Sequence, residues 1–427
     1  MSNVFPKKNF INLTKNFNQN KSNFKPYTKK LIEIAQKYKG NELVFCNTRN
    51  FIDFFNFLNE NEVLTIKNLN NLFTKEYSER NEMTGFCLSR LVYTFIQQFN
   101  RKNPRIQENI VLNRLLESNN ITRLNYKNTN LGESNIYFEE FTIYPNNTPA
   151  VMIFYLIVPE QNGYKIKIIF SIRGTQTLDD IFSLAKPQQK DVYLFNTNEI
   201  LQINENLKKP YKKEGFLKFG SNTIGNPTIH KGFRGYFRKI DKIILRKTLK
   251  FINMFSKRYG NKYKYLGSEF CFIGHSLGGA LAVLNSLNSL TSGYKTFIYS
   301  YCQPRIGGDK FNYFLYSQLL RNPESKYFLF YNKDDTVNYL PPRNIGYIHL
   351  SEFLKENELN LDNYEEKNKQ TANLQILEKE LGKTLKDALG YFSSKLFYSK
   401  ILHSLFLYKI AVKINGKKYD DYYLLHS

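Results

Sequence analysis

The sequence contains no stretch that approaches about 18 consecutive uncharged apolar residues, the length needed to cross a membrane as a helix. Its first 30 residues are polar and lack the apolar core of a secretory signal. We therefore expect no transmembrane segment and a cytoplasmic location. Contact with an anionic membrane surface would then be peripheral and transient.

Cysteine and histidine are scarce, with four cysteines and five histidines among 427 residues. The cysteines, Cys46, Cys87, Cys271 and Cys302, form no C-x-x-C pair, and two of them fall in apolar runs typical of strands. We predict buried free thiols. No clustered ligand spacing indicates a metal site, so we expect the chemistry to need neither a metal nor a cofactor.

Tryptophan is absent, although the chain has 36 Phe and 31 Tyr and is rich in Lys and Asn. AT-rich coding would produce this bias, so part of the net charge of +24 can reflect composition rather than a partner. A basic surface attracts anionic lipids and nucleic acid non-specifically. Because the sequence lacks zinc-ligand spacing, RNP-like aromatics and a long basic helix with heptads, we expect no specific nucleic-acid partner.

The composition and the spacing of apolar residues change along the chain. Residues 1–80 form a polar lead and a helical extension, and an amphipathic helix is predicted over 85–99. Three β-rich runs follow between about 135 and 175, separated by Asn, Pro and Gly turns, and the first two are hairpin-like. We predict two parts, the extension 1–80 and an α/β domain over 81–427.

The stretch "CFIGHSLGGALAVL" has the order of a nucleophile elbow. An apolar run suited to a buried strand leads to Gly274-His275-Ser276-Leu277-Gly278, and helix-forming residues follow. A serine at such a junction is held in a strained backbone conformation that exposes Oγ, and the glycines let strand and helix approach closely. Ser276 is therefore the candidate nucleophile.

Two further loops supply the other groups that an acyl-transfer serine enzyme needs. Oxyanion donors are expected from the backbone N–H of Leu277 and from Thr175, which follows a strand in "SIRGT". Asp335 lies in the loop after the strand-like run "YFLFYN". A serine, then an acid, with a histidine still to come, is the chain order of the α/β-hydrolase triad.

At this point the sequence resembles the class 3 lipases, the family that includes the fungal triacylglycerol lipases. The resemblance runs from about 85 to 350 and rests on "RGT", "HKGF", "GHSLGGALA", "QPRIG" and "DDTVNYLPP" followed by "GYIH". It implies an α/β-hydrolase fold, with a mostly parallel central sheet flanked by helices. It also implies Ser276 as nucleophile, Asp335 as acid, and Thr175 with Leu277 as the oxyanion hole. His230 and His349 fall on family histidines that are structural.

The sequence departs from the family pattern at several positions. Ile273 stands where Thr or Ser is usual, Cys302 replaces a Gly, and Gly308 replaces an Asn. Ile181 and Ser183 replace a tryptophan and an aspartate that commonly follow the oxyanion loop. None of these changes removes a catalytic group.

The catalytic base is chosen between two late histidines. His403 precedes the aromatic residues of "LHSLFLY", which fits the family pattern, whereas His426 is the penultimate residue. Chain ends fray unless they are tied down, and the base must stay within about 3 Å of the serine oxygen. We therefore favour His403 over His426.

The resemblance places a lid just after the oxyanion loop, where this chain has a long insert, 176–229. The insert mixes aliphatic and aromatic residues with the basic "KKPYKK" at 208–213, a combination that suits opening at an anionic lipid surface and equally suits a solvated loop. The expected activity is hydrolysis of lipid carboxylic esters, acylglycerols or phospholipids, through an acyl-enzyme. The alternative is a catalytically silent, lipase-like interaction protein.

Overall fold

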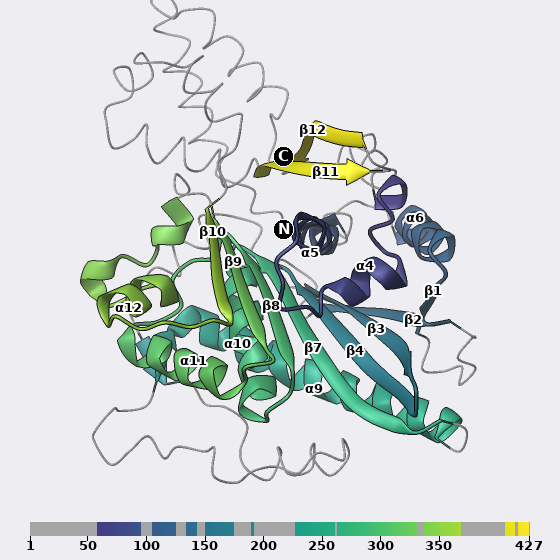
Figure 1. Ribbon diagram of the computed structural model, residues 1–427, viewed down its shortest axis with the longest axis horizontal. Coiled ribbons are helices and arrows are strands. Elements are labelled where there is room, and N and C mark those ends of the chain that lie inside the picture. Colours follow the sequence, from purple (N-terminus) through teal and green to yellow (C-terminus); the bar gives the residue numbers. More distant parts are fainter. Residues whose placement is uncertain are drawn as a thin grey trace, which may run out of the picture.

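This computed structural model describes ten stretches of the chain: 58–94, 105–124, 134–142, 150–174, 189–191, 227–260, 263–331, 336–368, 406–414 and 417–426. They contain a central sheet with helices on both faces (Figure 1) and two short strand pairs outside that sheet. Within these stretches, no helix is both long enough and apolar enough to cross a membrane.

The central sheet has eight strands in the order β1-β2-β3-β4-β7-β8-β9-β10. The strands are β1 (Ile121–Arg123), β2 (Ile136–Thr142), β3 (Ala150–Glu160), β4 (Gly163–Ile172), β7 (Tyr265–His275), β8 (Thr296–Tyr301), β9 (Lys326–Tyr331) and β10 (Tyr364–Asn368). Only the β2–β3 and β3–β4 pairs are antiparallel, and the other five are parallel. The predicted hairpin and the mostly parallel sheet are confirmed.

The parallel strands bring their carboxyl ends to one edge of the sheet. Ile172 at the end of β4 pairs with Gly274 on β7, and Gly274 pairs in turn with Ser300 on β8. The end of β8 pairs with β9 through Tyr301 and Phe330. Because loops at this edge follow buried strands, it is where α/β folds place ligands and catalytic groups. We call it the carboxyl edge.

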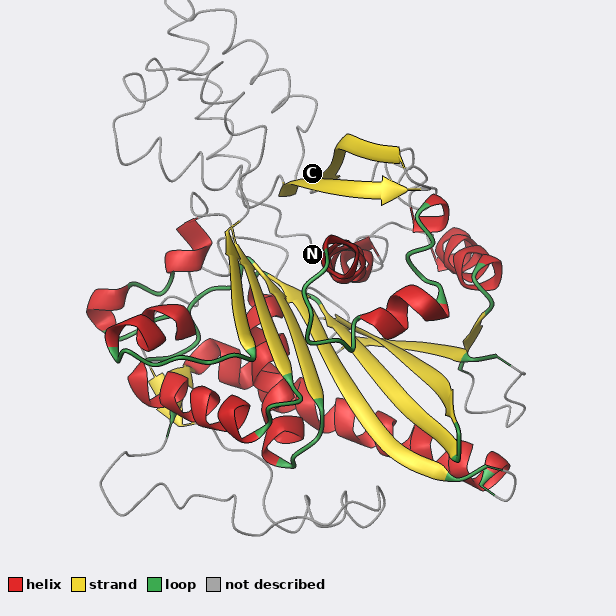
Figure 2. Ribbon diagram, viewed as in Figure 1, coloured by secondary structure: helices red, strands yellow, loops and turns green. Residues whose placement is uncertain are grey.

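The helices divide between the two faces of the sheet (Figure 2). One face carries α9 (Lys231–Tyr259), α10 (Leu277–Thr291) and α11 (Asp309–Arg321), and the other carries α4 (Ile66–Asn71), α5 (Glu79–Thr94) and α6 (Arg105–Ser118). Shorter elements follow: the 3-10 turns Thr336–Tyr339 (η5) and Arg343–Ile345 (η6), and α12 (Leu350–Glu356). This is the layered arrangement of the α/β-hydrolase fold, as expected.

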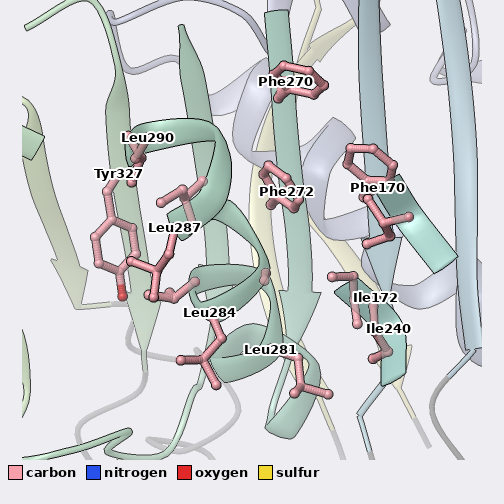
Figure 3. Close-up of a cluster of buried hydrophobic side chains, with 14 of the residues drawn as sticks. Phe170, Ile172, Ile240, Phe270, Phe272, Leu281, Leu284, Leu287, Leu290 and Tyr327 are labelled. Atoms are coloured by element: carbon pink, nitrogen blue, oxygen red, sulfur yellow. The ribbon is translucent and has the colours of Figure 1, made fainter. Parts of the chain in front are cut away.

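The strand residues alternate between two apolar cores. Phe170, Ile172, Phe270 and Phe272 face α9 and α10 (Figure 3), where they pack with residues such as Ile240. The intervening residues of the same strands belong to the core under α4 and α5. Strands that are buried on both faces lack polar alternation, which is why the sequence shows them as continuous apolar runs.

The helical extension shares the second core from residue 58 onward. Leu64 and Leu72 are fully buried in it, and Tyr299 Oη on β8 donates to the carbonyl oxygen of Leu72 over 3.2 Å. Tyr301 Oη donates likewise to the carbonyl of Glu82 over 2.8 Å. Residues 58–80 therefore pack directly on the sheet, and the division at residue 80 stays a prediction.

The helix predicted over 85–99 is present, but its boundaries differ from the prediction. The helix predicted over 85–99 begins earlier, because α5 starts at Glu79 with Glu79 and Glu82 in its first turn, where carboxylates favour a helix N-terminus. Its predicted last residues, 95–99, lie outside the described stretches.

The described cysteines, Cys87, Cys271 and Cys302, are buried free thiols, and Cys46 lies outside those stretches.

Two short antiparallel pairs lie outside the central sheet. β5 (Gln189–Asp191) pairs with β6 (Thr228–His230). β5 lies within the insert 176–229, and β6 begins inside its last residues. Near the end of the chain β11 (Phe406–Ile414) pairs with β12 (Lys417–His426). Residues 176–188 and 192–226 of the insert lie outside the described residues.

Candidate active site

Ser276 stands at the junction of β7 and α10, as the elbow pattern predicts. Its backbone angles are φ 55° and ψ −129°, a conformation that residues with a side chain rarely adopt. Its N–H donates to the carbonyl of Tyr301 over 2.9 Å, and its carbonyl accepts from Gly279 N over 2.9 Å. These bonds hold the strained residue between the sheet and the first turn of α10, which is the geometry of a nucleophile elbow.

The glycines on either side of Ser276 are required by close backbone approach. A Cβ on Gly274 would lie 2.1 Å from the carbonyl oxygen of Gly278. A Cβ on Gly278 would lie 2.2 Å from the carbonyl oxygen of Ile172 and 2.7 Å from the amide nitrogen of Gly174. Strand and helix can cross this tightly only without side chains, so the spacing of the motif has a direct steric cause.

The same contacts bring the end of β4 against the start of α10. Gly174 immediately precedes Thr175, the predicted second oxyanion residue, and Leu277 is the first residue of α10. The first N–H groups of a helix have no partner within it and favour negative charge. Thr175 itself lies outside the described residues, so its role stays a prediction.

The side chain of Ser276 does not cap α10, although serine is a common helix cap. The residue is only 2% exposed, and it directly precedes the first residue of α10. Its hydroxyl is therefore placed beside the helix N-terminus without being used to satisfy it. This arrangement suits a nucleophile more than a structural cap.

The predicted acid follows β9, two strands away from β7. Asp335 lies outside the described residues, but both of its flanks are described, Tyr331 at the end of β9 and Thr336 at the start of η5. β7, β8 and β9 are parallel, so the chain enters this loop at the same carboxyl edge as Ser276. The assignment of Asp335 stays a prediction.

A partly buried ion pair holds the segment that follows Asp335. Arg305 contacts Glu352 on α12 at two points, with Nε to Oε2 3.0 Å and Nη2 to Oε1 2.5 Å. Arg305 also donates from Nη1 to the carbonyl of Tyr339 over 2.9 Å, and its own N–H donates to the carbonyl of Leu340. The guanidinium thus ties η5 to α12. We call these contacts the Arg305 clamp.

His349 belongs to the same assembly. Its Nε2 contacts the carbonyl oxygen of Asn338, and its backbone N–H donates to Glu352 Oε2 over 2.7 Å. Burial lowers the pKa of His349 to about 4, so the ring is neutral near pH 7. Arg305 lies in the block "QPRIG", and no local sequence pattern points to Glu352 as its partner, because the two residues are 47 positions apart.

His230 is engaged at the start of α9. Its Nδ1 accepts from Gly232 N over 3.2 Å, and its ring packs on Phe233 with centroids 4.7 Å apart. Burial lowers the pKa of His230 to about 4. A ring that caps a helix and packs within a core is not positioned to exchange protons with substrate.

The base remains to be chosen between the two late histidines. His403 lies outside the described residues. The pairing of β11 with β12 runs to its last residues, where His426 is opposite Phe406, three positions after His403. The end of the chain is thus tied into a strand pair, which weakens the fraying argument against His426. Both histidines stay candidates, with His403 the prediction.

No group of three or more potential metal ligands occurs among the described side chains. The described part of the candidate site consists of the strained Ser276, the N-terminus of α10 and the carboxyl ends of the neighbouring strands.

Part of this chain matches a known protein family. Residues 169–345 match the family model of class 3 lipases. A lipase A from Sodiomyces alcalophilus is 31% identical over 143 residues, which cover 31% of this chain and 32% of that protein. A secreted mono- and diacylglycerol lipase from Fusarium solani is 36% identical over 83 residues, 19% of this chain and 23% of that protein. The chain thus matches about a quarter to a third of these relatives' length.

Solved lipase structures also align with the chain. A mono- and diacylglycerol lipase from Aspergillus oryzae covers 49% of this chain and 60% of its own, with 20% identity and a TM-score of 0.32. The Lip2 lipase from Yarrowia lipolytica covers 50% of this chain and 63% of its own, with 18% identity and a TM-score of 0.33. The resemblance stated from the sequence blocks is confirmed by the family match.

Proposed function

We propose, with the class 3 lipase region at 169–345 as the premise, that this protein hydrolyses carboxylic esters of lipids through a serine acyl-enzyme. The observation that carries the proposal is the backbone of Ser276, held at φ 55° between β7 and α10. Such strain persists only where the surrounding structure enforces it, and it is concentrated at functional sites.

The proposed reaction has two halves. His403 takes the proton from Ser276 as Oγ attacks the ester carbonyl, and the oxyanion is held by Thr175 and the N–H of Leu277. Collapse of the tetrahedral species breaks the ester bond, and the departing alkoxide receives the proton from the imidazolium. Water then attacks the acyl-enzyme with the same histidine as base, which releases the fatty acid. Asp335 orients the imidazole and stabilises its positive charge.

We propose acylglycerols as the substrate class to test before phospholipids. Support comes from the Fusarium solani relative, which is named as a mono- and diacylglycerol lipase. Fatty-acid release from matched monoacylglycerol, diacylglycerol, triacylglycerol and phosphatidylcholine emulsions would rank the two classes. A clear preference for phosphatidylcholine would overturn this choice while leaving ester hydrolysis in place.

A fluorophosphonate probe tests the chemistry directly, because it labels only an activated serine. We expect the wild type to be labelled and Ser276→Ala to be unlabelled. Ser292→Ala is the matched control, since Ser292 follows the other end of the same helix, and it should label like the wild type. Absence of labelling in a folded wild type would favour the silent interaction protein. Labelling of Ser276→Ala would show that another residue is the nucleophile.

A further inference from the structure

The longest helix of the described chain carries an unusual charge. α9 spans 29 residues and contains ten Lys and Arg but one acidic residue, Asp241. Asp241 is buried and accepts a hydrogen bond from Asn288 over 2.8 Å, so it contributes nothing to the outer surface. The outward charge of α9 is therefore entirely positive.

Eight of the basic residues of α9 are exposed. These are Lys231, Arg238, Lys239, Lys242, Arg246, Lys250, Lys257 and Arg258, and we call them the α9 basic face. The opposite side of the helix buries Phe233, Ile240, Ile244 and Phe251 against the sheet. At 3.6 residues per turn, most of the exposed positions fall on one stripe, about 40 Å long for a helix of this length.

Composition alone does not explain this face. The whole chain has 61 basic and 37 acidic residues, a far lower ratio than the ten to one of α9. On the other side of the sheet, α5 carries Glu79, Arg80, Glu82 and Arg90, two of each sign. α6 is likewise balanced, with two basic and two acidic residues. A coding bias toward lysine would raise the charge of all these helices together.

The α9 basic face extends from the carboxyl edge to the far edge of the sheet. At its start, Ile229 bridges to Gly307, which follows β8 at the same edge as Ser276. Beyond its end lie two of the exposed large apolar side chains: Tyr263, two residues before β7, at 46%, and Leu266, the second residue of β7, at 37%. An exposed tyrosine beside cations is the composition found at membrane interfaces.

We propose that the α9 basic face docks the protein onto an anionic lipid bilayer. Charge complementarity selects an anionic partner, and the choice of a lipid surface rests on the proposed lipid-ester function. Docking along α9 lays the strands of the sheet along the membrane and leaves the carboxyl edge, with Ser276, at one end of the contact. The surface differs from the insert lysines at 208–213, to which the sequence had directed attention.

Vesicle binding by the full chain tests the proposal. Lys242→Gln, Arg246→Gln and Lys257→Gln are combined, since all three are exposed on α9. The matched control combines Lys67→Gln, Arg321→Gln and Lys355→Gln, which removes the same charge from exposed positions on α4, α11 and α12. At low salt, partition into phosphatidylcholine–phosphatidylserine vesicles should weaken on the order of 100-fold for the α9 variant and far less for the control. High salt should remove the difference.

Equal vesicle binding by the two variants would overturn the proposal. Loss of duplex DNA retention in the α9 variant, with vesicle binding equal to that of the control, would assign the face to nucleic acid instead. Turnover of a soluble short-chain ester is measured on the same samples and should not change in either variant. A wild type that binds vesicles through α9 yet hydrolyses no ester would refute the proposed function and leave the docking surface standing.

Discussion

Arg305 and Glu352 form a two-point ion pair that joins the turn after β8 to α12, with the arginine side chain 6% exposed and the glutamate 28%. The same guanidinium donates to the backbone of η5, directly after the predicted catalytic acid. One side chain thus connects three segments at the carboxyl edge. Its planar fork of donors suits this task, whereas a lysine would supply only a point charge.

Removing the clamp should destabilise the protein. Arg305→Gln removes the guanidinium from Glu352, which keeps only the N–H of His349, and from the carbonyl of Tyr339. We therefore expect a loss of about 2–4 kcal/mol in the free energy of unfolding, measured by urea denaturation. Arg343→Gln is the control, because the pair of Arg343 with Glu356 is exposed and should be worth less than about 1 kcal/mol. Equal losses in the two variants would show that the clamp is not a stabilising contact.

Stability should fall as the pH drops from about 6.5 toward 4. The pKa of His230 and of His349 is lowered from 6.5 to about 4 in the folded state, so the unfolded chain binds more protons in this interval. His230→Asn keeps an acceptor for the α9 cap and removes one titrating group. The difference between the variant and wild-type unfolding free energies should therefore shift by about 1–3 kcal/mol between pH 7 and pH 4. Parallel pH curves would contradict this account.

The elbow glycines should not tolerate a methyl group. Gly274→Ala or Gly278→Ala places Cβ near 2.1–2.2 Å from a backbone oxygen, so we expect insoluble protein or a loss of more than about 3 kcal/mol. Gly235→Ala is the control, since a Cβ there meets nothing within 4 Å and lies on the exposed side of α9. It should stabilise the protein by about 0.5–1 kcal/mol. Thermal or urea unfolding of soluble Gly274→Ala at wild-type stability would refute the steric argument.

Because Ser276 is strained, replacing it with glycine should favour stability while abolishing activity. Ser276→Gly should raise the free energy of unfolding by about 1 kcal/mol relative to Ser276→Ala, because glycine adopts a positive φ without steric cost. Both variants should lose turnover of a soluble ester by several orders of magnitude. An active Ser276→Ala enzyme would exclude this serine as the nucleophile, and equal stability of the two variants would remove the strain argument.

Alanine substitutions at the two late histidines test which of them is the catalytic base. His403→Ala should lower kcat on a short-chain ester by several orders of magnitude while leaving unfolding nearly unchanged. His349→Ala should act mainly through stability, because its buried ring contacts the carbonyl oxygen of Asn338 in η5. If His426→Ala is the silencing change, the assignment moves to the end of β12.

The elbow and the strands around it were predictable because their causes are local. Gly274, Ser276 and Gly278 lie within one turn of chain, and a strand buried on both faces shows itself as an apolar run. The Arg305–Glu352 pair and the hydrogen bond from Tyr299 to Leu72 join residues 47 and 227 positions apart. Their partners are set by the topology of the sheet, which no local pattern contains. Thr175, Asp335 and His403 remain predictions of the sequence.

The pairing of Ile172 with Gly274 has a consequence for how this chain can vary in length. These neighbours on β4 and β7 are separated by about 100 residues, which include the insert 176–229. The entropic cost of closing a loop grows only with the logarithm of its length. Halving the number of residues between Ile172 and Gly274 therefore changes the cost of bringing them together by about 0.6 kcal/mol. The connection between β4 and α9 is therefore a place where evolution can add or remove residues with little effect on the equilibrium between folded and unfolded chains.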